Sequence, residues 1–558
     1  MTSRPAATSA SRIFPILLLG VALVIVNTWP LAARLDRIGR AESHDGRYSL
    51  WQATWVARAL VTDPIHVYDA NIFYPHRSTL AFSEPSLLAG VLGLPAYLIT
   101  HNAYATHNLA TLAFFLLSFL SAYWLGWRLT KDSVASAALG IAFAFSPYMF
   151  ARTAQLPMMA IFGLPLSLAA MHALVDAPSA RTAAGVGGAL WLQALACGYY
   201  TIFAILIVAL GMIVFGLQDR RWKSVPFWRW GIGAALVSIA LLLPLFWPHI
   251  RLGQTQGFSR PLTEAYQLSA DWHAWLASSA WAHRWMLPLL GTWNEVLFPG
   301  FLPMALAIAG AWLGLRGRLN APARAIAPRS LAVFFVLLAI LSAWLAFGPA
   351  AGLYAVFYAA IPVFSFIRSA GRFGIVTTLA VAALMALALA HMNRVSGRGR
   401  TIAAVLVVML AAEMFSAPRP MTPALPVSPV YRVLAAQPRG PAIEFPLFPR
   451  QLERNSEYVL MSTEHWQPIV NGYGAFWPAD VQQLAADTRD FPSRAALERV
   501  RARGVRYVVV HPTTYERLGY ASANDVIAGL EALGSDLNLI ASDQHVRLYQ
   551  ISGWTAVR

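Results

Sequence analysis

Long apolar segments recur along this chain and constrain its fold more than any other feature. A helix needs about 20 consecutive apolar residues to cross a bilayer core. Segments that approach or exceed this length lie at 13–33, 105–127, 133–150, 158–175, 182–196, 200–217, 230–248, 298–315, 330–347, 374–391 and 401–415. Charged residues make up only 12% of the chain, against about 25% in soluble domains. The sequence therefore predicts a polytopic α-helical membrane protein with about eleven spans.

Positive charge gathers on one side of the predicted membrane. With a cytoplasmic N-terminus, the inside segments hold sixteen Lys and Arg against three Asp. These segments are 1–12, 128–132, 176–181, 218–229, 316–329 and 392–400. The positive-inside bias of membrane proteins thus accounts for most of the net charge of +16, and we expect no nucleic-acid partner. Forty Arg against two Lys indicate a GC-rich bacterial genome, hence a bacterial inner membrane with a periplasm outside.

The predicted topology divides the chain into three parts. A transmembrane domain covers 1–415, a proline-rich linker covers 416–440, and a periplasmic α/β domain covers 441–558. In the last of these, buried strands are expected at 442–447 and 506–511, helices at 493–503 and 524–533, and a hairpin at 538–551.

Two large outside loops have the composition of a membrane interface. The first loop, 34–104, begins with a predicted helix in which Tyr48, Trp51 and Trp55 form an aromatic stripe. It also holds an apolar segment at 86–100 that is too short to span and is typical of a half-buried helix. The second loop, 249–297, is rich in Trp and His.

Asp45 lies in Ser-His-Asp-Gly, where the helix of the first loop is expected to begin. The positive end of a helix dipole favours an ionised carboxylate, which could act as a base. Asp is also a favoured N-cap residue, so capping and catalysis both stay open. The neighbouring His44, and Glu84 in the same loop, are candidate substrate-binding residues. With His76 these carboxylates could hold a divalent metal, although no metal-ligand spacing supports it.

Arginines lie at the predicted outer surface. Arg368 and Arg372 precede the span at 374–391, and two guanidiniums beside the free N–H groups of a helix N-terminus suit a phosphate. Anchoring to lipid headgroups is the alternative. Arg152 follows the third predicted span and is either a further phosphate ligand or an anchor. Gln155, three residues later, is a candidate substrate ligand.

The tail segment 461–478 is dense in aromatic and amide side chains. Trp466 and Tyr473 could stack on a sugar while His465 and Asn471 hydrogen-bond it. Packing of this segment in a protein core is the alternative.

The predicted spans are nearly free of ionisable residues. Apart from Glu413, none contains Asp, Glu, Lys or Arg. Ion-coupled transporters place such groups near the membrane midplane, so the sequence disfavours one. The chain also lacks a P-loop, a Rossmann fingerprint and a nucleophile elbow. Polar chemistry is therefore expected at the outer surface.

The order of these parts resembles the GT-C superfamily of membrane glycosyltransferases, which includes protein O-mannosyltransferases and the aminoarabinose transferase of lipid A. The resemblance covers about residues 10–420 by architecture. It rests on an acid heading an interfacial helix (Asp45) and on Glu84-Pro85 entering a half-buried helix. Segment 366–373 and Asn471-Gly472-Tyr473 are also similar to segments of large bacterial GT-C-like proteins.

The resemblance implies a polyprenyl-phosphate-linked sugar donor and a lipid, glycan or protein acceptor. It implies inverting transfer of a hexosyl or pentosyl group at the periplasmic face, with Asp45 as base and Arg368, Arg372 and Arg152 on the donor phosphate. Many relatives carry a second acid after the third span, where this chain has Gln155, which puts a metal cofactor in doubt. The alternative is a non-catalytic, flippase-like protein for lipid-linked glycans, which would tolerate loss of the Asp45 charge.

Overall fold

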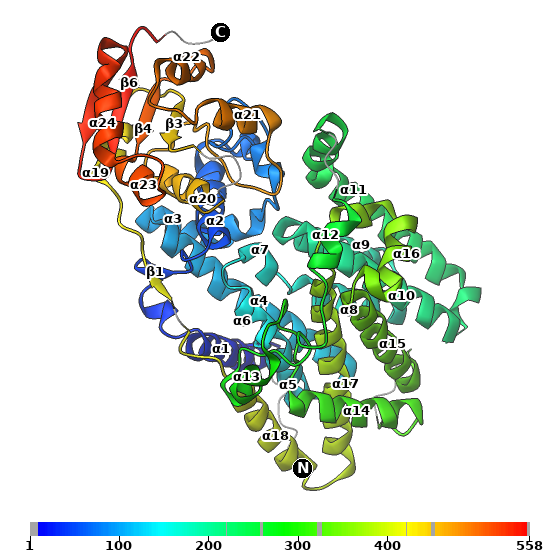
Figure 1. Ribbon diagram of the computed structural model, residues 1–558. Helices are drawn as coiled ribbons and strands as arrows, with labels where there is room; N and C mark the ends of the chain where they lie inside the picture. Colours follow the sequence, from blue (N-terminus) through cyan, green and yellow to red (C-terminus); the bar gives the residue numbers. More distant parts are fainter. Residues whose placement is uncertain are drawn as a thin grey trace. The chain divides into compact units, whose positions relative to one another are not determined.

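The computed structural model describes residues 9–218, 220–256, 260–320, 326–419, 421–447 and 452–554 (Figure 1). Residues 1–8, Asp219 and Arg324 of the predicted inside segments lie outside these ranges, as does Pro420 of the predicted linker. The chain forms two compact units. Unit 1 comprises Met1–Arg34 and Thr111–Pro420, and unit 2 comprises Leu35–Ala110 and Met421–Arg558. Unit 2 thus joins the first outside loop to the tail, a pairing that the sequence did not predict.

Unit 1 is helical. Its helices are α1 (Ser9–Asn27), α5 (Ser133–Ala144), α6 (Pro147–Ala151), α7 (Leu156–Met159), α8 (Gly163–Asp176), α9 (Ala180–Ala196), α10 (Gly198–Gln218), α11 (Val225–Gln256), α12 (Leu262–Gln267), α13 (Leu287–Leu290), α14 (Phe301–Leu315), α15 (Pro328–Ala346), α16 (Leu353–Ala360), α17 (Gly374–Val395) and α18 (Gly399–Glu413), with most of α4 (Ala103–Thr130). Each predicted span overlaps one of these helices, or two consecutive ones, which confirms a polytopic helical protein.

Seven helical segments of the described chain are long and apolar enough to cross a membrane. They are Ala103–Thr130, Ser133–Ala151, Leu156–Asp176, Gly198–Gln218, Val225–Thr255, Pro328–Ala346 and Ala370–Val395. The total of eleven spans stays a prediction.

Helix α17 is the central helix of unit 1. In its most apolar stretch 94% of the residues are buried, and it packs against α5, α14, α15 and α18. Alanines dominate its buried surface, and small side chains let membrane helices approach closely. This packing fixes the N-terminal end of α17, where the predicted phosphate-binding arginines lie.

Unit 2 carries a four-stranded mixed sheet of order β3-β4-β6-β5. Its strands are β3 (Ala442–Phe445), β4 (Tyr507–Val510), β5 (Leu537–Ser542) and β6 (Arg547–Ile551); the first two run parallel and the last two form the predicted hairpin. Its helices are α2 (His44–Thr62), α3 (Leu87–Thr100), α19 (Pro429–Ala435), α20 (Leu452–Met461), α21 (Ala479–Asp487), α22 (Arg494–Ala502), α23 (Pro512–Arg517) and α24 (Ala523–Ala532). The strands and helices predicted for the tail are therefore confirmed.

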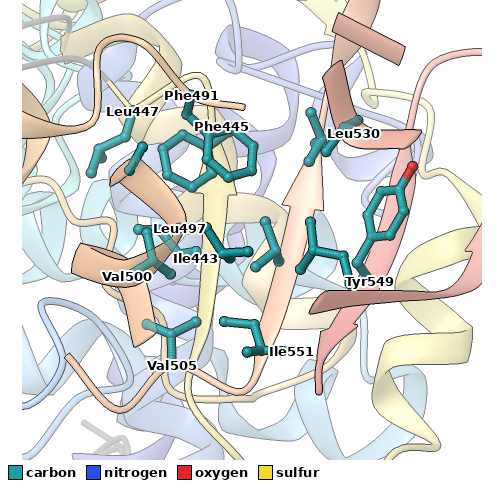
Figure 2. Close-up of a cluster of buried hydrophobic side chains, with 14 of the residues drawn as sticks. Ile443, Phe445, Leu447, Phe491, Leu497, Val500, Val505, Leu530, Tyr549 and Ile551 are labelled. Carbon is teal, nitrogen blue, oxygen red and sulfur yellow. The ribbon is translucent and has the colours of Figure 1, made fainter. Parts of the chain in front are cut away.

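The two parallel strands β3 and β4 are mainly apolar, with Glu444 as their one charged residue. Every residue of both strands is buried, as expected for strands covered on both faces. Figure 2 shows Ile443 of β3 beside Leu497 and Val500 of α22. The Phe445 ring stacks on Phe491 with centroids 3.9 Å apart.

Backbone hydrogen bonds join the first loop to the tail within unit 2. The amides of Phe73 and Tyr74 donate to the carbonyls of Asn471 and Ile469, and the amide of Ile469 donates to Asn71. Segment 468–470 pairs in turn with β3 through Ala442. Residues 71–74 of the first loop are therefore connected to β3 through segment 468–471 of the tail.

Helix α2 packs against α3 and α20, and its aromatic stripe is inside the protein. Tyr48, Trp51 and Trp55 are between 0% and 7% exposed. The stripe therefore packs inside unit 2 and not against lipid, and the position of α2 in the plane of the interface stays a prediction. An amphipathic helix buries its apolar face against whichever apolar surface the fold provides, and here that surface is the tail.

Asn471→Ala is expected to destabilise unit 2. The side chain is fully buried, and its amide donates to the Glu444 carbonyl (2.9 Å) and accepts from the Glu444 amide (2.7 Å). Leaving these backbone groups unpaired costs about 2 kcal/mol or more. Thermal unfolding of the purified protein in detergent measures the loss, with Asn524→Ala on an exposed helical turn as control. An unchanged unfolding temperature would contradict the role given to this amide.

Candidate active site

Asp45 lies in the first turn of α2, but it is not the helix cap. Ser43 is the N-cap residue, and its hydroxyl accepts a hydrogen bond from the amide of Gly46 (3.1 Å). A side chain at position 46 would collide with the carbonyl of Arg40, so this turn requires glycine. The capping interpretation of Asp45 is therefore wrong.

The Asp45 carboxylate accepts a short hydrogen bond from Tyr473. The two oxygens are 2.5 Å apart, the carboxylate is 36% exposed and the tyrosine 8%. His44 completes the group: its Nε2 lies 4.0 Å from the carboxylate and its ring 5.7 Å from that of Tyr473. Unit 2 thus brings together three of the predicted site residues, from segments more than 400 positions apart.

Glu84 lies beside the same helix. Its backbone carbonyl accepts a hydrogen bond from Gln52 of α2. Burial and, second, the Glu84 charge raise the pKa of Tyr68 to about 12.

His465, Trp466 and Asn471 lie apart from the Asp45–Tyr473 pair. His465 stacks on Tyr431 and is buried, which lowers its pKa to about 3. Both sides of the Asn471 amide are engaged by the backbone of β3. Trp466 is half-buried beside Trp55, with ring centroids 5.9 Å apart. The packing interpretation of segment 461–478 thus describes His465 and Asn471.

In unit 1, Arg152 pairs with a carboxylate that sequence reasoning missed. Its guanidinium forms an ion pair with Glu295, which is 6% exposed, and donates to Gln155 at 3.1 Å. Glu295 comes from the second outside loop, whose Trp-rich composition indicates an interface and gives no sign of a buried acid. Arg152 and Gln155 are therefore brought together as the sequence suggested, but the arginine is already neutralised.

The segment 366–373 is built around this pair. Ser369 donates its backbone amide to the Tyr199 hydroxyl (2.6 Å) and its own hydroxyl to Glu295 (3.4 Å). A side chain at Gly371 would meet the Glu295 side chain at 2.7 Å, so glycine is needed for the close approach. Phe373 stacks on Phe203 and anchors the end of the segment.

Arg368 and Arg372 are the arginines of this cluster without a carboxylate partner among the described residues. Arg372 lies 4.8 Å from the centre of the Tyr199 ring, and its Nε is buried without a hydrogen-bond partner. Arg368 is half-buried, and its charge adds to burial in lowering the pKa of Arg260. Arg260, from the second outside loop, is thus a further cation that sequence reasoning missed.

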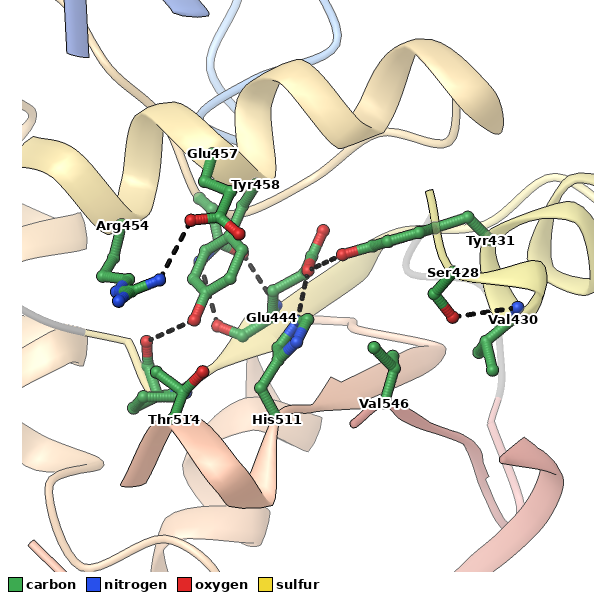
Figure 3. A network of polar contacts seen from close by, with 12 residues as sticks. Ser428, Val430, Tyr431, Glu444, Arg454, Glu457, Tyr458, His511, Thr514 and Val546 are labelled. Carbon is green, nitrogen blue, oxygen red and sulfur yellow. Dashed lines mark hydrogen bonds and ion pairs between the residues drawn. The ribbon is translucent and has the colours of Figure 1, made fainter. Parts of the chain in front are cut away.

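A second buried carboxylate, Glu444, belongs to strand β3 of the sheet of unit 2. Figure 3 shows Glu444 accepting hydrogen bonds from Tyr431 (2.7 Å) and His511 (2.8 Å). Burial first, and then the Glu444 charge, raise the pKa of Tyr431. Because Glu444 is on β3 and His511 follows β4, the network ties the two parallel strands to α19.

No group of three or more His, Cys, Asp or Glu within the described ranges could hold a metal ion. His76 lies with Asp480, at 2.9 Å, and has no such contact with Asp45 or Glu84.

No protein-family model and no curated protein matches this sequence. Its fold is similar to that of the arabinofuranosyltransferase AftD from Mycobacteria, with a TM-score of 0.59 and 15% identity. That match covers 98% of this chain and 40% of the other. The fold is also similar to the oligosaccharyltransferase of Archaeoglobus fulgidus, with a TM-score of 0.52 and 14% identity over 98% of this chain and 74% of the other.

This chain has the GT-C glycosyltransferase fold. The resemblance found in the order of its sequence elements therefore extends to three dimensions. The chain spans only 40% of the length of AftD, and identities this low establish the fold alone. The fold alone does not define the reaction, which depends on the side chains of the site.

The GT-C-fold chain should lose stability in acid through His465. Its folded-state pKa of about 3 lies below the ordinary 6.5, so the unfolded chain binds the extra proton as pH falls from about 6.5. The contribution of His465 to the free energy of unfolding is fully present above pH 6.5. It falls by about 1.4 kcal/mol per pH unit below that value. His465→Asn should flatten this dependence in unfolding measured from pH 7 to 5. His66→Asn, at an exposed histidine, should leave it unchanged.

Proposed function

We propose that this chain is an inverting glycosyltransferase. It moves a sugar from a polyprenyl-phosphate donor to a lipid, glycan or protein acceptor at the periplasmic face of the bacterial inner membrane. The observation that carries the proposal is the Asp45 carboxylate: it heads a helix without capping it, is partly exposed, and accepts a hydrogen bond from Tyr473. The GT-C fold supports the same reaction class.

Asp45 is suited to accept the proton of the acceptor hydroxyl. Its carboxylate is partly exposed in the first turn of α2, and the Tyr473 hydroxyl donates to one of its oxygens and orients it. In an inverting displacement the acceptor oxygen attacks the anomeric carbon from the side opposite the phosphate. The bond between that carbon and the phosphate oxygen breaks, the phosphate leaves with the electron pair, and the proton passes to Asp45.

The arginines of unit 1 are suited to the departing phosphate. Charge develops on its oxygens as the bond breaks, and preorganised cations stabilise that charge. Arg368 and Arg372 are the first candidates, because neither has a carboxylate partner among the described residues. The charge of Arg152 is balanced by Glu295. Because Glu295 also accepts a hydrogen bond from Ser369, we propose that Arg152 positions segment 366–373 through Glu295.

Asp45→Asn should abolish transfer while preserving the fold. Loss of a general base lowers rate by about 10²–10⁴-fold. The measurement is the surface-glycan and polyprenyl-phosphate-sugar profile of a strain lacking the protein, complemented at equal expression with wild type, Asp45→Asn or Asp36→Asn. The Asp45 variant should leave one sugar missing and its lipid donor accumulated, whereas Asp36→Asn restores it. Full restoration by Asp45→Asn would favour a flippase-like carrier instead.

Arg368→Gln should weaken use of the donor. Losing one charge-assisted contact to phosphate corresponds to about a tenfold rise in the donor KM. Transfer is measured with purified protein and membrane-extracted lipid donor, while the acceptor KM should stay unchanged. Arg251→Gln, at an exposed position of unit 1, is the matched control. A donor KM unaltered by Arg368→Gln would remove this arginine from the site.

A further inference from the structure

A polar hollow of about 540 Å³ lies at the C-terminal end of α2, within unit 2. Trp55, Arg58 and Thr62 of the helix line one side, and Arg77 and Arg439 belong to the remaining wall. Arg58 lies thirteen positions after Asp45, so at about 1.5 Å per residue the two are roughly 20 Å apart along one helix. The hollow is therefore separate from the Asp45–Tyr473 pair.

Three arginines line the hollow against two carboxylates, and none of the three forms an ion pair within the described residues. No carboxylate of the described residues lies within ion-pair distance of Arg58, Arg77 or Arg439. The two acids in the wall have other partners: Asp63 pairs with His66 (2.9 Å), and Asp69 accepts from the amide of Ser78 (2.7 Å).

Arg58 and Arg439 also repel each other. Burial, and then the charge of Arg439, lower the pKa of Arg58. An anion between the two guanidiniums would relieve that repulsion and pair with both.

Aromatic rings stand beside these cations. The guanidinium of Arg58 lies 5.0 Å from the centre of the Trp466 ring, which in turn lies next to Trp55. Trp466 has a φ of +52°, in the left-handed region that bulky residues rarely adopt. Such strained conformations concentrate at functional sites. A flat ring beside an arginine suits a sugar that carries a negative charge.

We infer that this hollow is a binding site for the anionic group of a saccharide, a phosphate or a carboxylate. Arg58 and Arg439 hold the charge, and the half-buried Trp466, beside Arg58, packs against the sugar ring. The inference rests on the proposed function only where it assigns this saccharide to the acceptor, which would then be an acidic glycan or a glycosylated lipid headgroup. Binding itself does not depend on transfer.

Calorimetry on the full-length protein in detergent tests the site with glucose 6-phosphate, glucose and inorganic phosphate. Glucose 6-phosphate should bind more tightly than either of the other two. Arg439→Gln, at an exposed position, and Arg58→Gln should each weaken it about tenfold. Trp466→Phe should weaken the sugar phosphate and leave inorganic phosphate unchanged. The exposed Arg489→Gln is the matched control and should have no effect.

A competition arm distinguishes the two sources of the anionic group. Displacement of glucose 6-phosphate by dioctanoyl phosphatidylglycerol would assign the site to a lipid headgroup, and lack of displacement to a glycan. Absence of binding, or equal weakening by Arg489→Gln, would overturn the site. Asp45→Asn separates the two proposals, because it should bind glucose 6-phosphate normally while transfer is lost. If the wild-type protein fails to bind glucose 6-phosphate while its Asp45-dependent transfer is intact, the hollow is overturned and the proposed function stands.

Discussion

The backbone pairing of residues 71–74 with 469–471 is the constraint on which the rest of unit 2 depends. It joins segments almost 400 residues apart, and Asn71 secures it through hydrogen bonds from its side chain to Ser462 and Gln467. Because Tyr473 lies two residues after Asn471, the same pairing places the Tyr473 hydroxyl beside Asp45. A short pairing of β1 (Ile38–Gly39) with β2 (Thr422–Pro423) adds a second tie between loop and tail. The candidate base is thus held by long-range backbone contacts and not by its own helix alone.

The arginines of the two units differ in the partners that surround them. In unit 1 the Arg152–Glu295 pair is nearly buried, and removing one partner would leave an uncompensated charge in a low dielectric. Arg372 lies instead against the face of the Tyr199 ring, which favours a cation without cancelling its charge. In unit 2 the arginines around the hollow are partly solvated and stay unpaired among the described residues. Cations without carboxylate partners among the described residues, in both units, are what both proposals of anion binding rest on.

Sequence reasoning recovered local features well. The helix bearing Asp45, the short helix at Leu87–Thr100 and the strands and hairpin of the tail were all expected from periodicity and turn residues. It failed where a side chain's partner comes from far along the chain. Glu295 and Arg260 lie in a loop whose composition signals an interface, and nothing in their neighbourhood points to Arg152 or Arg368. The aromatic stripe of α2 equally suits a membrane interface or a protein partner, and its partner in the tail is again distant in the sequence.

By itself, the sequence determined a polytopic helical chain, the GT-C order of its parts and a carboxylate at the head of a loop helix. Those features follow from hydrophobic period, charge asymmetry and capping chemistry, which act over a few turns. Only the tertiary structure decided that Ser43 caps the helix, that Tyr473 binds Asp45, and that Glu295 neutralises Arg152. These pairings depend on which distant segments share a buried surface, and burial decides which polar groups must find partners.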